Sequence, residues 1–344
     1  MHSKHLDSQI RPGNLVRLAL LAASLLLFAT VASGDEDGVE INEIVVFGDS
    51  LSDTGNVLLA TGGFVPASPP WFEGRFTNGP VWHEVLAEGL GVPAAGPNLM
   101  GGGNYAWGGA ETGPGFALFG GVPNVGTQIE TYLAMHTPGA DQLFIVQGGN
   151  NDLIPPGAPA DPGVMVANVV DHVSVLAAAG ARHFLVPTTV VTDTVPGLNP
   201  PLSDYLFPPD IVPPEALPAV IADILERNRR FNRLLRQGLH KLEKELNGLY
   251  GTVTISFVNL AITTRLMANA PALFGLTDVS SPAVTSYFDP TCFCEGVAAE
   301  DANSYFYFDI VHPTATVHEV IGEQALRALS WKLALADRRN DASG

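Results

Sequence analysis

Residues 45–56 read VVFGDSLSDTGN, a short apolar run that ends in a Gly-Asp-Ser turn and continues into a polar segment expected to start a helix. An apolar strand that ends in glycine lets the next side chains project at the carboxyl end of a sheet, where free backbone N–H groups can meet a substrate. Ser50 is therefore a candidate nucleophile. Asp and Ser are also common in turns and helix caps, so this stretch alone is weak evidence.

Two further polar clusters lie far along the chain in a compatible order. Gly149-Asn150-Asn151-Asp152 follows the apolar run 143–147, and Asp309-Ile310-Val311-His312-Pro313 lies near the C-terminus. Parallel strands end at one edge of a sheet, so the sequence predicts that the three clusters converge there.

The residue types in these clusters suit serine catalysis. A serine hydroxyl needs a base as it attacks, and a histidine that titrates near neutrality, here His312, fits that role. Asp309 lies three residues earlier and can reach the other imidazole nitrogen, which fixes the tautomer. We therefore predict a triad of Ser50, Asp309 and His312. The alternatives are a helix cap for Ser50 and a buried, hydrogen-bonded histidine for His312. Asp49 and Asp152 are interpreted as structural residues that hold their loops.

The motifs resemble those of the SGNH hydrolases, also called GDSL lipases and esterases, over most of the chain after residue 40. The similar segments are FGDSLSDTGN (47–56), RFTNGPVW (75–82), NYAWGGA (104–110), GNND (149–152) and DIVHP (309–313). The resemblance implies an oxyanion hole formed by the backbone N–H groups of Ser50 and Gly109 and the side-chain amide of Asn151. Gly108 remains an alternative to Gly109, because a slip of one residue in this glycine-rich stretch would exchange them.

Other chemistries find no matching pattern. The α/β-hydrolase motif Gly-x-Ser-x-Gly fails because Ser52 stands where the second glycine is needed. Residues 49–60 lack the glycine and the terminal glutamate of a calcium loop. There is no zinc-ligand spacing and no phosphate loop. We therefore expect neither a metal nor an organic cofactor.

The N-terminus is typical of a cleavable secretory signal. Lys4, Arg11 and Arg17 precede the apolar stretch 18–29, and small residues follow at 32–34. A membrane span needs about 20 apolar residues, so a retained anchor is the less favoured alternative. We predict a signal peptide over 1–34, a secreted protein and a single domain over 35–344.

Charge and composition limit the partners. The formal net charge is −18 and only 15% of the residues are charged, so the chain is globular and its acidic surface repels nucleic acid and anionic membranes. The expected partner is a small-molecule or lipid ester, without stable membrane insertion. The sequence does not set an oligomeric state.

Alternating short strands and helices predict the architecture. Residues 44–47, 143–147, 183–187 and 252–258 are short and apolar, as buried parallel strands are, and residues 164–179, 217–246 and 316–336 are typical of helices. This order predicts a three-layer α/β/α, doubly wound, mostly parallel sheet of the flavodoxin-like kind.

Two segments, 62–80 and 192–218, are rich in proline, glycine and aromatic residues and are expected to be ordered loops. Their aromatic residues, and two between them, are candidates for an acyl groove or for simple loop packing: Trp71, Phe72, Phe76, Phe116, Phe119, Tyr205 and Phe207. Cys292 and Cys294 are expected to form a disulfide in an exported protein, with a pair of covered thiols as the alternative.

The sequence thus predicts a secreted serine ester hydrolase that works through an acyl-enzyme on Ser50. Acyl transfer to another acceptor and carbohydrate acetyl-ester hydrolysis use the same triad and remain alternatives. A secreted binding module without catalysis is the more distant one.

Overall fold

Four parallel strands form the centre of the molecule. The computed structural model describes residues 40–117, 121–154, 160–285, 289 and 291–341. The strands run in the order β1 (Glu43–Phe47), β2 (Gln142–Val146), β3 (His183–Pro187) and β4 (Thr254–Val258). Val45 pairs with Phe144 and Phe184 with Ile255, and these side chains are buried. All four strands lie where the sequence predicted them, to within two residues at each end.

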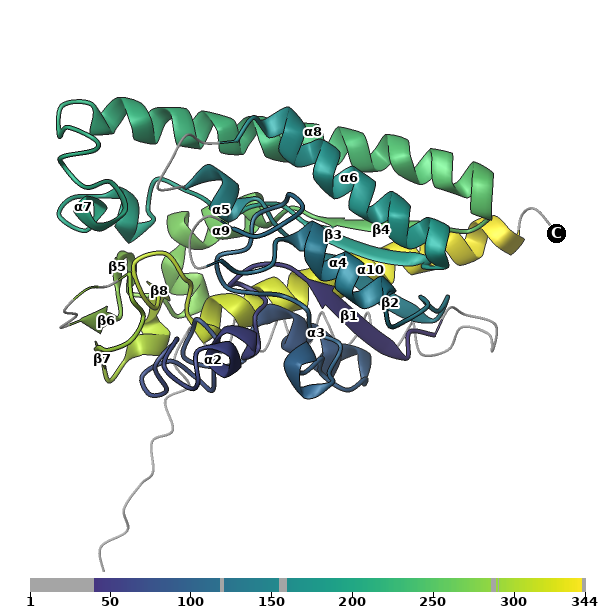
Figure 1. Ribbon diagram of the computed structural model, residues 1–344, viewed down its shortest axis with the longest axis horizontal. Coiled ribbons are helices and arrows are strands. Elements are labelled where there is room, and N and C mark those ends of the chain that lie inside the picture. The colour runs from purple at the N-terminus through teal and green to yellow at the C-terminus, as the bar shows by residue number, and fades with distance from the viewer. Residues whose placement is uncertain (1–39, 118–120, 155–159, 286–288, 290, 342–344) are drawn as a thin grey trace, which may run out of the picture.

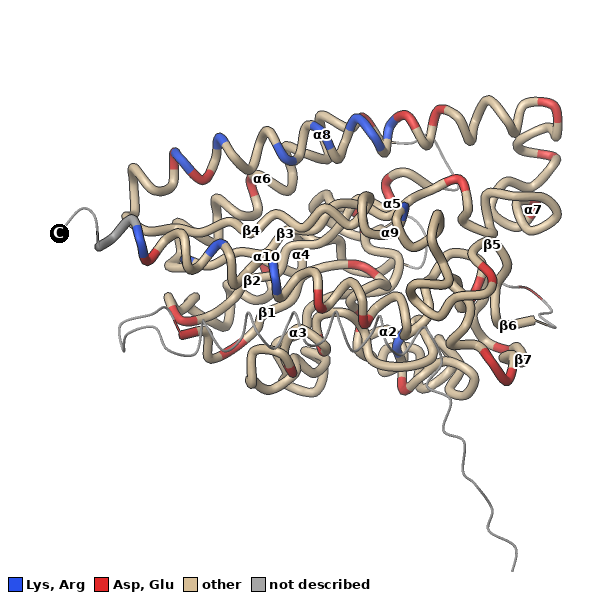
Figure 2. Tube along the Cα trace, turned by 180° about the vertical axis from the view of Figure 1, so that it is seen from behind, with Lys and Arg blue, Asp and Glu red and all other residues tan. Residues whose placement is uncertain are grey.

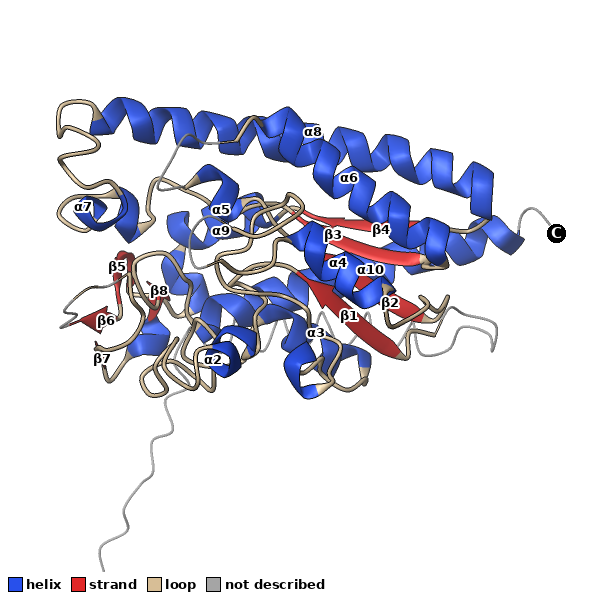
Figure 3. Cartoon of the chain, in the orientation of Figure 1, coloured by secondary structure: helices blue, strands red, loops and turns tan. Residues whose placement is uncertain are grey.

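Helices cover both faces of this sheet (Figure 1, Figure 3). One face carries α4 (Val125–Leu133), α6 (Pro162–Ala179) and α8 (Leu217–Tyr250), and the other carries α3 (Trp82–Leu90) and α10 (Ala315–Asp341). The buried leucines of α8 recur at helical spacing, which gives the helix its core-facing side. The prediction of a three-layer α/β/α fold is confirmed.

Helix α6 shows how local signals set an element. Asp161 caps it by accepting a hydrogen bond from the Gly163 N–H at 2.7 Å, Pro162 occupies its first turn, and Gly180 ends it. In the described part of the chain it is the one helix long and apolar enough to cross a membrane by length and composition. It packs on α8 and β2 through a buried apolar side, so it serves here as a core helix.

The remaining elements gather beyond the carboxyl ends of the strands, at the left of Figure 1. They are short and joined by long loops, and comprise α2 (Asn56–Ala60), α5 (Asn150–Leu153), α7 (Ser203–Leu206), α9 (Leu260–Asn269), β5 (Asp278–Pro282), β6 (Val284–Thr285), β7 (Val297–Ala298) and β8 (Tyr305–Tyr307). Residues 62–80 form a loop as predicted, whereas 192–218 also contains α7 and the first turn of α8. This irregular end of the molecule holds the three polar clusters.

Charge is unevenly placed over these layers. Lys and Arg residues are concentrated along α8, the outer helix of one layer (Figure 2). Many of them pair with acidic neighbours on the same helix, such as Arg227 with Asp223. The basic residues are therefore concentrated away from the end that carries the polar clusters.

Candidate active site

Ser50 lies in a tight turn directly after β1. The N–H groups of Ser52 and Asp53 both donate to the carbonyl oxygen of Asp49, and α2 begins only at Asn56. The helix expected from the polar segment after the turn therefore begins at the last residue of that segment. The free N–H of Ser50 therefore belongs to the turn between β1 and α2 and not to the first turn of a helix.

Side-chain amides from two other elements fix the residues before Ser50. Gln128 on α4 accepts from the Gly48 N–H and donates to its carbonyl oxygen, each at 2.9 Å. Gln147 accepts from the Asp49 N–H at 3.1 Å, and a Cβ on Gly48 would lie 2.5 Å from that same amide oxygen. A side chain at position 48 would therefore displace the Gln147 amide oxygen from the position in which it accepts from the Asp49 N–H.

Asp49 and Asp152 hold loops together, in agreement with their structural interpretation. Asp49 accepts from the Leu51 N–H and from the amide of Asn150, which ties the Ser50 turn to α5. Asp152 accepts from the N–H and the hydroxyl of Thr112. Burial raises the pKa of Asp49 and raises the pKa of Asp152 to about 6.

His312 brings the C-terminal cluster onto Ser50. Its Nε2 lies 2.8 Å from the Ser50 Oγ, and its Nδ1 lies 2.8 Å from Oδ2 of Asp309. Asp309 is completely buried and also accepts from the His312 backbone N–H at 2.8 Å. The structure thus places the three predicted residues in one hydrogen-bonded chain, in an order that can move a proton from Ser50 to His312.

A further hydrogen bond to Asp309 comes from a residue that the sequence did not mark for this role. The indole N–H of Trp71 donates to Oδ2 of Asp309 at 3.0 Å, and Trp71 is only 1% exposed. The two residues are 238 positions apart, so no spacing rule could pair them. The only signal was that Trp71 lies just before the RFTNGPVW segment.

The predicted oxyanion donors differ from Gly108 in their hydrogen bonding. Gly108 donates to Oδ2 of Asp53 at 3.0 Å and is therefore occupied. Across the described residues, no acceptor takes the N–H of Ser50 or of Gly109, and Gly109 has a φ of 88°. The amide of Asn151 donates one hydrogen to the carbonyl oxygen of Ala110 at 2.9 Å, which leaves its second hydrogen available. This geometry favours Gly109 over Gly108 as the second backbone donor.

Asp53 has a further function that the sequence did not indicate. Its buried carboxylate accepts from the N–H groups of Gly55, Asn56 and Val57, which start α2, as well as from Gly108. Burial raises its pKa to about 6 against the effect of these four donors. One carboxylate thus joins the segment after Ser50 to the glycine-rich segment opposite.

The candidate aromatic residues of the loops divide into a buried group and an exposed group. Trp71, Phe76 and Phe207 are buried, and Phe76 contacts the His312 imidazole at a centroid distance of 5.1 Å. Phe72, Phe116 and Tyr205 are at least 36% exposed. Phe119 lies outside the described residues. The burial of Trp71 and its bond to Asp309 agree with the loop-packing alternative for this residue.

The expected bridge between Cys292 and Cys294 is present, with a Cα–Cα distance of 5.1 Å. Among the residues that the structure describes, no group of three His, Cys, Asp or Glu side chains could hold a metal ion.

Comparison with known proteins places this geometry in a family. A family model described as GDSL-like lipase/acylhydrolase matches residues 44–325. A thermolabile hemolysin from Vibrio parahaemolyticus is 27% identical over 308 residues, which cover 84% of this chain and 64% of that protein. A phosphatidylcholine-sterol acyltransferase from Aeromonas hydrophila is 33% identical over 135 residues, which cover 38% of each chain. A GDSL esterase/lipase from Arabidopsis thaliana is 23% identical over 355 residues, which cover 89% of this chain and 95% of that protein.

The chain therefore spans less than two thirds of the first two relatives and nearly all of the third. The family match includes the turn at Ser50, the glycine-rich segment and the His312 cluster. This chain belongs to the GDSL-like lipase/acylhydrolase family.

Proposed function

We propose that this protein is a serine hydrolase of carboxylic esters in which Ser50 forms an acyl-enzyme. The observation that carries the proposal is the 2.8 Å contact between the Ser50 Oγ and the His312 Nε2, with Asp309 on the far imidazole nitrogen. This is the arrangement in which a hydroxyl gains a base and the base gains an orienting carboxylate.

The first half of the reaction transfers the acyl group. His312 Nε2 takes the hydroxyl proton as the Ser50 Oγ attacks the ester carbonyl, and Asp309 stabilises the imidazolium that forms. The negative charge on the carbonyl oxygen meets the N–H groups of Ser50 and Gly109 and the free amide hydrogen of Asn151. The imidazolium then protonates the departing alcohol. Water, deprotonated by His312, attacks the acyl-enzyme in the second half and releases the acid and Ser50.

We also propose that residues 1–34 are a signal peptide, that the protein works outside the cytoplasm after this peptide is cleaved, and that residues 35–344 form a single domain. The basic and apolar pattern of the leader supports this compartment. The Cys292–Cys294 disulfide also supports it, because such bonds persist mainly in exported proteins.

The test is hydrolysis of p-nitrophenyl esters, from acetate to palmitate, by the mature protein and its Ser50→Ala variant. We expect Ser50→Ala to lower kcat by about 10⁶-fold, since loss of the nucleophile removes the acyl-enzyme route. Ser203→Ala is the control, because Ser203 lies at the start of α7, away from His312, and its buried hydroxyl has no hydrogen-bond partner among the described residues. Equal turnover by wild type and Ser50→Ala would refute the mechanism.

The ester chain length separates the substrate classes within this proposal. An optimum at long chains indicates a lipid ester, and an optimum at acetate indicates a small acyl group such as that of an acetylated sugar. A folded protein that neither turns over any ester nor reacts with a serine-directed phosphonate would instead be a binding module.

Acyl transfer is the second candidate, favoured by the match to the Aeromonas acyltransferase. Transfer uses the same residues and differs only in the acceptor that attacks the acyl-enzyme. Product analysis with a phospholipid and added sterol distinguishes the two, because hydrolysis yields free acid and transfer yields a sterol ester.

A further inference from the structure

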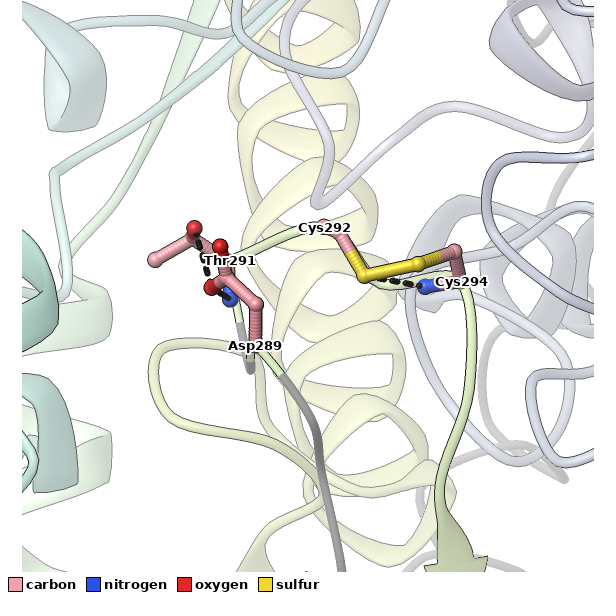
Figure 4. Close-up of a disulfide and its surroundings, with 4 residues drawn as sticks. All are labelled: Asp289, Thr291, Cys292 and Cys294. Atoms are coloured by element: carbon pink, nitrogen blue, oxygen red, sulfur yellow. Dashed lines mark hydrogen bonds between the residues drawn. A yellow bond between two sulfur atoms is a disulfide. The ribbon is translucent and has the colours of Figure 1, made fainter.

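The segment Cys292-Phe293-Cys294 holds an aromatic residue in an unusual backbone conformation. The disulfide closes around Phe293, which has a φ of 49° (Figure 4). Bulky side chains rarely occupy this left-handed region, and where they do the surrounding structure must hold them there. Such residues concentrate at functional sites.

Contacts on both sides of Phe293 hold it. The Ala67 N–H donates to the Phe293 carbonyl oxygen at 2.8 Å, and the Cys294 N–H donates to the Cys292 Sγ at 3.3 Å. One turn earlier, Asp289 accepts from both the N–H and the hydroxyl of Thr291, as Figure 4 shows. The bridge and these bonds together fix the direction of the Phe293 side chain.

The Phe293 ring is directed at the catalytic end of the molecule. Its centroid lies 5.2 Å from that of His312, at an interplanar angle of 67°. It also lies 5.6 Å from Phe76 and 6.1 Å from Trp71, in edge-to-face contacts. Phe76 contacts His312 as well, and Trp71 bonds Asp309. Two phenyl rings thus contact the imidazole, and Phe293 touches the residues that hold both His312 and Asp309.

We propose that Phe293 is a positioning residue for His312 and that the Cys292–Cys294 disulfide is what keeps it in place; this rests on the proposed function. The ring limits rotation of the imidazole and keeps water from the Asp309–His312 pair. Without the bridge, residue 293 is free to return to an ordinary extended or helical conformation, and its ring leaves the imidazole. Cys294 is exposed, so a reductant can reach the bond.

The experiment compares Phe293→Ala, Phe293→Tyr and the double variant Cys292→Ser/Cys294→Ser with wild type. The readouts are kcat and KM for p-nitrophenyl acetate, and the rate at which Ser50 reacts with diethyl p-nitrophenyl phosphate. We expect Phe293→Ala to lower kcat and the labelling rate by about 10-fold to 100-fold at a nearly constant KM, the effect of a misplaced catalytic group. Phe293→Tyr keeps the ring and restores most of both rates.

A second experiment tests the disulfide directly by reducing it. Dithiothreitol should lower the kcat of wild type to that of the double-serine variant, and should leave the double-serine variant unchanged. This experiment needs no substitution in the wild-type chain, so it decides the matter even where Phe293→Ala fails to fold, which the thermal unfolding midpoint reports.

Three outcomes would overturn the proposal. One is a wild-type kcat in Phe293→Ala, which would reduce the ring to packing. Another is a raised KM for p-nitrophenyl acetate in Phe293→Ala at unchanged kcat, which would make Phe293 a wall of the substrate pocket. The third is insensitivity of wild type to dithiothreitol after the bridge is shown to be reduced. A wild type that is neither active nor labelled at Ser50 contradicts the proposed function itself, and is distinguishable because all variants then match it.

Discussion

The active site is built from two halves that are held in different ways. The nucleophile half comprises Ser50, the 107–110 segment and Asn151, all next to the ends of β1 and β2. Buried polar contacts fix it, such as those of Gln128 with Gly48 and of Asp53 with Gly108. The base half comprises Asp309 and His312 on the loop between β8 and α10. Aromatic rings surround it, and Trp71, Phe76 and Phe293 contact it from loops.

The two kinds of contact constrain different parts of the site. Hydrogen bonds from buried side chains to backbone groups are directional and fix the conformation of a backbone turn, which is what a set of oxyanion donors requires. Ring contacts fix an imidazole by shape. We therefore expect changes in the nucleophile half to act on transition-state stabilisation, and changes around the base half to act on the orientation of His312.

The largest effect within the base half is expected from Asp309→Asn. The amide can donate to the His312 Nδ1 and so favour the wrong tautomer, which should lower kcat for p-nitrophenyl acetate by about 10⁴-fold. Asp171→Asn, at an exposed position on α6, is the control. A loss below tenfold would mean that Asp309 does not orient His312.

A smaller loss is expected in the nucleophile half from Asn151→Ala. Removing one oxyanion donor costs about 2.7–4 kcal/mol, so kcat should fall by about 10²-fold to 10³-fold. Asn150→Ala is the matched control, because Asn150 bonds Asp49 and the Val190 N–H instead. It should lower the unfolding midpoint and reduce kcat less than Asn151→Ala. The reverse ranking would contradict the assignment of Asn151.

The packing of α10 on α3, next to the base half, gives a prediction about pH. Burial lowers the pKa of His318 to about 3. Its Nδ1 accepts from the backbone N–H of Trp82 at 3.2 Å, and this bond joins α10 to α3. An unfolded histidine takes up a proton below about pH 6.5, whereas folded His318 stays neutral, so this contribution to stability is present above pH 6.5 and is lost as the pH falls toward 3. At pH 5 this effect lowers the free energy of unfolding by about 2 kcal/mol relative to its value well above pH 6.5.

Urea unfolding of wild type and His318→Gln at pH 7.5 and pH 5 measures this loss. The wild type should lose about 2 kcal/mol more than the variant between the two pH values. If both lose the same amount, His318 is already protonated in the folded state or is not buried.

The smallest effect is expected from a pair of tryptophans. Trp71 donates to Asp309 and Trp82 donates to the Ser52 hydroxyl at 3.1 Å, and both are almost fully buried. Trp71→Phe removes a hydrogen bond to a charged acceptor, worth about 1.5–3 kcal/mol, part of which orients the triad, so kcat should fall by about 10-fold. Trp82→Phe should lower the unfolding midpoint with kcat nearly unchanged. Equal kcat values for the two variants would show that the Trp71 bond acts on stability alone.

The two halves also differ in how far the sequence predicted them. The strands and the long helices follow from apolar periodicity, and Ser50, Asn151 and His312 follow from polar residues at strand ends and from the family motifs. Local spacing could not show that the Gly108 N–H is occupied and the Gly109 N–H is free, because the acceptor for Gly108 is Asp53, 55 residues away. Trp71 and Phe293 carry no periodic signal, since they lie on irregular loops whose positions depend on long-range packing.

The distance along the chain between the halves sets an order of assembly. Ser50 and His312 are 262 residues apart, and Asn151 and Gly109 lie on the Ser50 side of that interval. Because synthesis runs from the N-terminus, the nascent chain contains Ser50, Gly109 and Asn151 before it contains Asp309 and His312. The hydrogen-bonded chain of Ser50, His312 and Asp309 can therefore form only after the 309–312 segment has been made and has folded back across the sheet.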